Sequence, residues 1–237
     1  MALNTIFKAR KAMKLHNEGK FDEALKLYEE CMSEGMTDMK AILPYSVLLL
    51  RSGQYQKARE LLVAVQKYPM ADDQKRQLYV NYAVAVYKLG DLDKALEVLE
   101  VQQKKAESGL VYETLGYLLV EAGDFDKSLE YNLKALEYDD EDPITLDNLG
   151  QTYYRLKGDK ETAKGYFDKA LEQKPGQLDT LYFLAQYDIE AGNREAAREK
   201  LETVRDGRFS PLNFASKEKA EELLKTLYPS SLWATSI

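Results

Sequence analysis

The 237-residue chain has few of the side chains from which metal and redox sites are built. It contains one cysteine, Cys31, and one histidine, His16, so an intramolecular disulfide is excluded and a transition-metal site is disfavoured. Cys31 lies among small and apolar helix positions, where a buried structural thiol is expected. These two residues are also the one candidate nucleophile–base pair, but they fall on consecutive antiparallel helices and are not expected to meet.

Long apolar runs and glycine-rich phosphate loops are also missing. No stretch approaches eighteen apolar residues, so no membrane-spanning segment is predicted. Residues 1–15 lack the apolar core of a signal peptide, which favours a cytoplasmic protein and leaves open an anchor trimmed from the N-terminus. No GxxxxGK[ST], GxGxxG or GxSxG motif occurs, so the sequence predicts no enzyme, no cofactor and no metal.

Basic residues are outnumbered, with 33 Lys and Arg against 40 Asp and Glu and a net charge of −7. This acidity disfavours a nucleic-acid partner, whose phosphates attract basic surfaces. The densest acidic run, residues 139–142, directly precedes Pro143. We expect it to cap a helix that begins at this proline, while attraction of a basic partner is the alternative.

Glycine recurs at a regular interval, and each occurrence opens a similar phrase such as GDLDKALEVLEVQ. The six glycines are Gly19, Gly53, Gly90, Gly123, Gly158 and Gly192. Five positions later stands a small residue, namely Ala24, Ala58, Ala95, Ser128, Ala163 or Ala197. Four positions further stands a larger one, namely Tyr28, Leu62, Leu99, Asn132, Phe167 or Leu201. Because i and i+4 share a helix face, each phrase predicts a turn followed by a helix that packs closely against a neighbour.

Four polar residues that follow these glycines are candidate N-caps: Asp91, Asp124, Asp159 and Asn193. Upstream of each glycine lies a second apolar-periodic stretch, as in residues 112–122, 145–156 and 180–191. Each period near 34 residues is therefore predicted to be two antiparallel helices joined by a glycine turn. Neither helix buries its apolar face alone, so the pairs must stack.

The phrases resemble the tetratricopeptide repeat family. The fourth repeat carries the best match, with Leu115-Gly116, Leu119, Gly123, Phe125, Ser128, Ala135 and Pro143. The fifth matches at Leu149-Gly150, Tyr153, Ala163, Phe167, Ala170 and Pro175, but has one extra residue before its turn. The resemblance implies an all-α fold, a right-handed α-solenoid of about six stacked helix-turn-helix repeats plus a C-terminal capping helix.

The expected boundaries make residues 1–228 one superhelical domain. The repeats are expected at about 5–38, 39–72, 76–109, 109–142, 143–177 and 178–211. A capping helix is expected at 213–228 and a flexible tail at 229–237.

The family resemblance also implies which residues line the concave face, where first helices of such repeats present a partner-binding groove. The predicted binding residues are Met13, Lys40, Leu43, Val47, Val80, Asn81, Val84, Tyr87, Glu113, Tyr117, Asp147, Gln151, Tyr154, Tyr182 and Gln186. Packing between first helices is the alternative role for each of them. Tyrosines on such a surface combine large contact area with a polar tip.

These observations predict a non-enzymatic scaffold or adaptor that binds a protein or peptide through this groove. One alternative is a regulator that responds to a small peptide, with Asn81, Gln151 and Gln186 bonding the peptide backbone. Another is a homo-oligomer that assembles through the apolar first helix, which carries Ile6 and Phe7.

Overall fold

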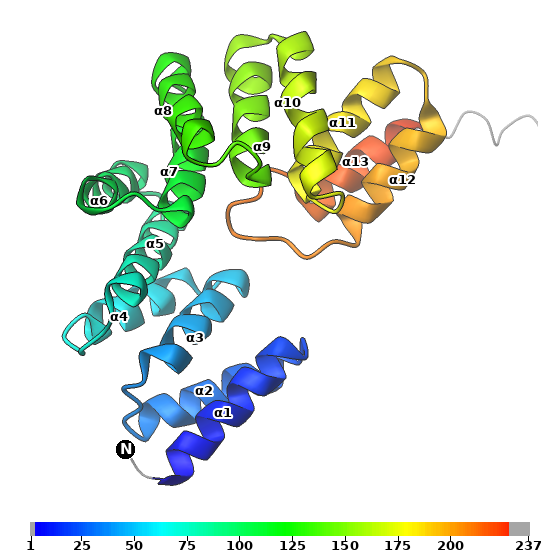
Figure 1. The fold of residues 1–237 in the computed structure, drawn as a ribbon. Coiled ribbons are helices and arrows are strands. Elements are labelled where there is room, and N and C mark those ends of the chain that lie inside the picture. Colours follow the sequence, from blue (N-terminus) through cyan, green and yellow to red (C-terminus); the bar gives the residue numbers. More distant parts are fainter. Residues whose placement is uncertain (1–2, 228–237) are drawn as a thin grey trace, which may run out of the picture. The chain divides into compact units, whose positions relative to one another are not determined.

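The computed structural model describes residues 3–227, and every regular element in that range is helical. The helices form antiparallel pairs, each with a first helix and a second helix (Figure 1). The first three pairs are α1 (Leu3–Asn17) with α2 (Phe21–Ser33), α3 (Met39–Arg51) with α4 (Tyr55–Val65), and α5 (Asp72–Lys88) with α6 (Leu92–Lys105). The next three are α7 (Gly109–Ala122) with α8 (Phe125–Tyr138), α9 (Pro143–Gln151) continued by η1 (Thr152–Lys157) with α10 (Lys160–Gln173), and α11 (Leu178–Glu190) with α12 (Arg194–Arg205). The predicted all-α fold of helix pairs is confirmed.

The chain divides into two compact units, residues 1–111 and residues 112–237. Within unit 1, α1 contacts α3 and α3 contacts α5, so its three first helices form a continuous row. Within unit 2, α8 contacts α9 and α10 contacts α11. The grouping of all repeats into one continuous domain stays a prediction.

Each repeat glycine lies in the turn between the two helices of a pair, where the chain needs a residue with left-handed backbone conformation. The six repeat glycines have φ between 73° and 94°, a region that side chains other than glycine rarely adopt. Asp91, Asp124 and Asp159 then accept a backbone N–H three residues on, as predicted. The prediction for Asn193 was wrong, because its side chain makes no such bond. Asp142 caps α9 by accepting the Thr145 N–H at 2.8 Å, which confirms the capping role of the acidic run.

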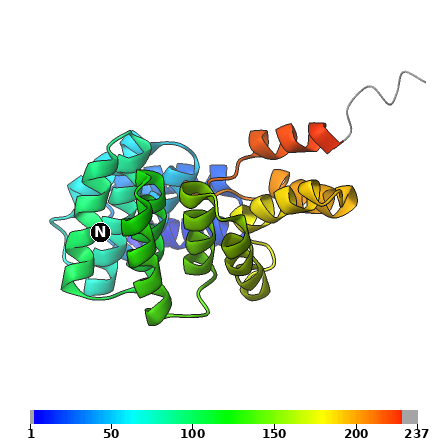
Figure 2. The same cartoon turned by 90° about the horizontal axis from the view of Figure 1, so that it is seen from above.

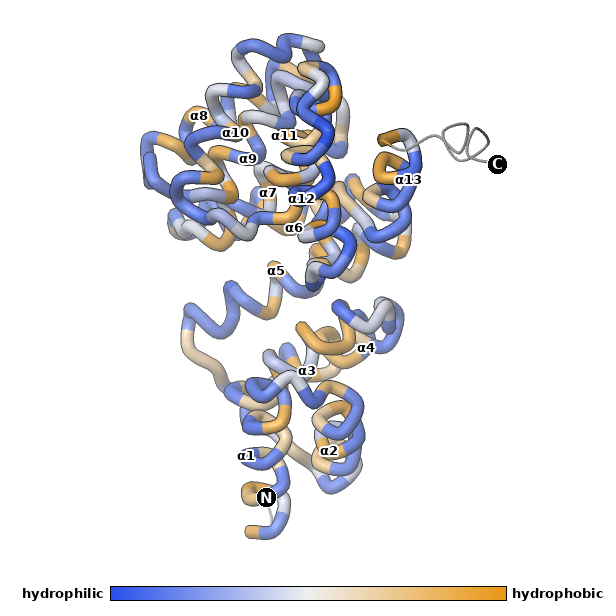
Figure 3. Tube along the Cα trace, turned by 90° about the vertical axis from the view of Figure 1, so that its right-hand side faces the viewer, coloured by the Kyte–Doolittle hydropathy of each residue, from blue (hydrophilic) through white to orange (hydrophobic). Residues whose placement is uncertain are grey.

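The small and large positions of the second helices form the centre of the packing. All twelve side chains of these two sets are fully buried. Along most helices hydrophobic and hydrophilic segments alternate, as expected for elements buried on one side only (Figure 3). Local spacing in the sequence therefore fixed both the helices and the faces that they bury.

The extra residue of the fifth repeat is accommodated as a π-helix. Residues 152–157 form η1, and Gly158 at φ 73° then ends it. A single inserted residue widens one turn of a helix in this way without changing the faces that flank it. Tyr154 and Arg155 lie in this irregular turn, and both take part in the contacts described below.

The last helix, α13 (Lys217–Leu227), lies beside α12 and covers the end of unit 2 (Figure 2). The capping helix is confirmed, but its predicted start at residue 213 was wrong. Residues 206–216 form a non-helical connection, and Phe214 lies within it. The backbone N–H groups of Phe214 and Ala215 bond to the Asp179 carboxylate instead of to preceding carbonyls, which delays the helix. The tail predicted at 229–237 lies outside the described residues.

Candidate partner-binding face

In unit 1 the predicted binding residues differ in how far they reach solvent. Leu43, Val80 and Val84 are buried among the first helices. Met13, Val47 and Tyr87 are half-buried, one on each of the three first helices, and Lys40 is exposed. We call Met13, Val47 and Tyr87 the unit 1 row. Its members present apolar surface on three first helices, of which α1 contacts α3 and α3 contacts α5.

A hydrogen-bond chain crosses from α5 to α3 beneath this row. Asn81 is buried, accepts from Gln77 Nε2 at 2.7 Å and donates to Ser46 Oγ at 2.8 Å. Ser46 in turn donates to the Leu43 carbonyl at 2.7 Å. The Asn81 amide thus joins two first helices, as expected for a buried polar group.

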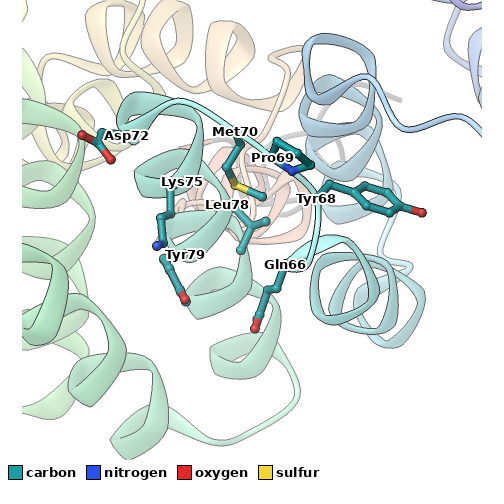
Figure 4. Close-up of a pocket in the computed structure, with 8 residues that line it drawn as sticks. All are labelled: Gln66, Tyr68, Pro69, Met70, Asp72, Lys75, Leu78 and Tyr79. Carbon is teal, nitrogen blue, oxygen red and sulfur yellow. The ribbon is translucent and has the colours of Figure 1, made fainter.

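The turn between α4 and α5 encloses a pocket of about 260 Å³ (Figure 4). Met70 and Leu78 lie at its centre, while Tyr68 and Asp72 point outward on opposite sides. Lys75 and Tyr79, four residues apart on α5, also line it. None of the predicted binding residues lines this pocket. The pocket holds no buried charged side chain, because its two charged lining residues, Asp72 and Lys75, are both exposed.

In unit 2 most predicted binding residues are buried by contacts within the unit. Tyr117 is 5% exposed and Tyr182 is 9% exposed. The half-buried Tyr154 donates to Gln186 Oε1 at 3.2 Å, and its ring lies 5.0 Å from that of Phe183. Phe183 also stacks on Phe167 at 4.9 Å. Tyr154 and Tyr182 therefore belong to an aromatic cluster that connects η1, α10 and α11.

Buried carboxylates form the second feature of unit 2. Asp147 accepts from Thr180 Oγ1 at 2.6 Å and from Gln151 Nε2 at 2.7 Å. Burial, and next the neighbouring Asp179 carboxylate, raise the pKa of Asp147 well above its ordinary value. Burial likewise raises the pKa of Asp179. The two carboxylates thus carry an electrostatic cost that their hydrogen bonds offset only in part.

Arg155 connects this polar set to α7. Its Nη1 donates to Glu121 Oε1 at 2.7 Å and to Gln151 Oε1 at 2.9 Å. Glu113, also on α7, is largely enclosed, and burial together with the charge of Asp142 raises its pKa to about 7. The amides of Gln151 and Gln186, offered above as partners for a peptide backbone, thus already hold bonds inside unit 2.

The sequence did not point to residues 209–216 or to Arg155 as parts of this face. The segment lies outside the repeat phrases, and Arg155 falls in the irregular π-helical turn. Phe214 packs on Tyr182 and Phe183, with ring centroids 6.0 and 5.2 Å apart. An aromatic residue after the last repeat was the one available sign.

Cys31 and His16, the candidate nucleophile–base pair, both make packing contacts within unit 1. Cys31 is fully buried, its thiol directed to the Thr5 carbonyl, and burial raises its pKa. The His16 ring instead lies edge-on to Phe21 and Tyr28. Among residues 3–227 there is no cluster of three or more His, Cys, Asp or Glu side chains placed to hold a metal ion. No helix of that range is long and apolar enough to cross a membrane.

Two sequence profiles described as tetratricopeptide repeat match residues 15–79 and 113–177. Together they cover more than half of the chain. The chain belongs to the tetratricopeptide repeat family. A tetratricopeptide protein of Thermus thermophilus, TTC0263, has a similar fold, with a TM-score of 0.60 and 25% identity over 74% of this chain and 94% of that one. The tetratricopeptide fold generally serves protein–protein interaction and is typically non-enzymatic.

Curated relatives of this chain include proteins whose names refer to assemblies. The BBSome complex member BBS4 of Bos taurus is 29% identical over 65% of this chain and 28% of its own length. A photosystem I assembly protein, Ycf3, of Prochlorococcus marinus is 29% identical over 44% of this chain and 66% of its own length. The chain therefore spans less than two thirds of the length of either relative.

Proposed function

We propose that this tetratricopeptide protein is a non-enzymatic scaffold that binds an apolar segment of a partner protein on the first helices of unit 1. The unit 1 row carries the proposal, because Met13, Val47 and Tyr87 keep part of their surface accessible on three touching helices. Burying such apolar and aromatic surface is the main favourable contribution to most protein interfaces. Relatives named as a complex member and an assembly protein support a role of this class.

Two substitutions on unit 1 test the row. Val47→Asp places a carboxylate in its centre, whereas Val63→Asp makes the same change on α4 at a side chain that is 52% exposed. We expect affinity capture from a lysate of the source organism to retain one partner with wild type and with Val63→Asp, and to lose it with Val47→Asp. Equal capture by folded Val47→Asp contradicts the row as the binding surface.

A second candidate function is self-assembly through α1. Leu3 is 71% exposed and Phe7 is 58% exposed, so this helix presents apolar surface to solvent. If α1 pairs between copies, the mass in solution rises with concentration and Phe7→Asp abolishes the rise. A monomer mass that is independent of concentration refutes assembly.

A further inference from the structure

The connection between α12 and α13 is longer than the other junctions between pairs in unit 2. Residues 139–142 and 174–177 join α8 to α9 and α10 to α11, whereas residues 206–216 join α12 to α13. The segment turns back from the end of α12 toward α9 before α13 begins (Figure 1). Its extra length brings Phe214 onto the first helices of unit 2 instead of closing a short turn.

Asp179 holds the backbone of this segment. Its two carboxylate oxygens accept the N–H groups of Phe214 and Ala215 at 3.0 and 2.8 Å. Asp179 is buried on α11, one turn before Tyr182. Because both bonds come from consecutive main-chain N–H groups, this carboxylate recognises a bent backbone whatever its side chains are.

The Phe214 ring supplies the side-chain contact. It stacks on Phe183 at 5.2 Å and 23°, and the Arg155 guanidinium carbon lies 4.2 Å from its centre. Arg155 is itself fixed by Glu121 and Gln151, so the cation is held in place before the ring arrives. Cation–π and stacking contacts of this kind suit an aromatic anchor and no other side chain.

Asn213 and Lys219 also fix the position of this connection, although neither belongs to the surface on which Phe214 packs. Asn213 Oδ1 accepts the Ser210 N–H at 2.6 Å and fixes the turn before Phe214. Lys219 on α13 donates to the Phe214 carbonyl at 2.7 Å, and its Nζ lies 3.4 Å from the centre of the Phe214 ring. Phe214 nevertheless stays half-exposed. The segment thus resembles a bound peptide that is tethered to its own receptor.

We propose that the surface made by Arg155, Asp179 and Phe183 recognises a bent peptide segment with one aromatic anchor, and that residues 209–216 are its intramolecular occupant. A partner with this chemistry gains access only by displacing them. The proposal concerns unit 2 and does not depend on the function proposed for unit 1. A tethered occupant competes at an effective concentration in the millimolar range, so only a tighter or multivalent partner displaces it.

The test uses the full chain and a fluorescent synthetic peptide with the sequence of residues 208–219, RFSPLNFASKEK. We expect Phe214→Ala to bind this peptide at least tenfold more tightly than wild type does, because the variant has lost its own anchor. A peptide with alanine at the Phe214 position is expected not to bind. Asp179→Asn added to Phe214→Ala removes one acceptor and weakens binding. Val63→Ala, at an exposed position of α4 in unit 1, is the control and behaves as wild type.

Circular dichroism establishes that each variant keeps its helix content. If Phe214→Ala loses helix, Lys219→Gln takes its place, because it releases the Phe214 carbonyl and leaves the surface beneath intact. Equal binding by wild type and either folded variant overturns the proposal, as does absence of binding by both. A doubled mass of wild type that disappears in Phe214→Ala assigns the segment to a second copy of the chain and also overturns it.

Discussion

Gly150→Ala tests how the close approach of α9 and α10 supports the aromatic cluster of unit 2. A methyl group at this position meets Phe167 Cε1 at 2.5 Å and Cδ1 at 2.6 Å. Phe167 is fully buried and stacks on Phe183, so its ring has no open space to enter. Gly165→Ala on α10 is the matched control, because nothing lies within 4 Å of its added methyl group.

The expected cost follows from these contacts. Carbon atoms pack at about 3.5–4.0 Å, so the Phe167 ring must move by roughly 1 Å. Overpacking a closed core in this way costs about 1–3 kcal/mol, and the better helix propensity of alanine returns about 0.5–1 kcal/mol. We expect Gly150→Ala to lower the free energy of unfolding by about 1–2 kcal/mol. Gly165→Ala, which gains propensity alone, should raise it by about 0.5–1 kcal/mol.

Urea unfolding followed by circular dichroism measures both variants, and a double-mutant cycle assigns the cause. Replacing Phe167 by leucine removes the ring atoms that the new methyl group meets. Gly150→Ala should therefore cost less in the Phe167→Leu background than in wild type. A cost that is the same in both backgrounds, or a Gly150→Ala protein as stable as Gly165→Ala, refutes the reasoning.

Two further predictions concern stability. Ala95 is a fully buried residue of α6, the helix that packs on α5. Ala95→Leu should therefore lower the free energy of unfolding by roughly 1–3 kcal/mol. Hydrogen exchange should show unit 1 opening while unit 2 stays protected, and one cooperative loss of all helices contradicts this. The pKa of Glu113 in the folded protein is about 7, above its ordinary value. The free energy of unfolding of wild type therefore falls as pH rises through 7, because the buried carboxyl group must then ionise. Glu113→Gln, which keeps the shape of the protonated carboxyl group, should be more stable than wild type by about 1–2 kcal/mol at pH 8, after allowance for partial solvent screening, and about equal to it near pH 4, below the ordinary pKa of the carboxyl group. Urea unfolding at both pH values checks this, and a difference that does not change with pH counts against it.

Local signals in the sequence were sufficient to predict the helix pairs and their packing faces. Gly90 opens a turn, Asp91 caps the helix that follows, and Ala95 with Leu99 faces its neighbour, all within ten residues. Such signals are local, because turn conformation, capping and amphipathic spacing act over one or two helical turns. Even the extra residue of the fifth repeat was visible as an irregular interval, although its accommodation as a π-helix was not.

Which side chains of the first helices remain accessible depends on contacts that form in the folded chain and could not be predicted from the repeat positions. Tyr117 occupies the repeat position equivalent to that of Val47, six residues before the turn glycine, yet it is buried whereas Val47 is half-exposed. The pairing of Asp179 with the Phe214 and Ala215 backbone joins residues 35 and 36 positions apart. No periodic pattern encodes a contact made by a segment outside the repeats, because its position depends on the whole surface on which it comes to rest.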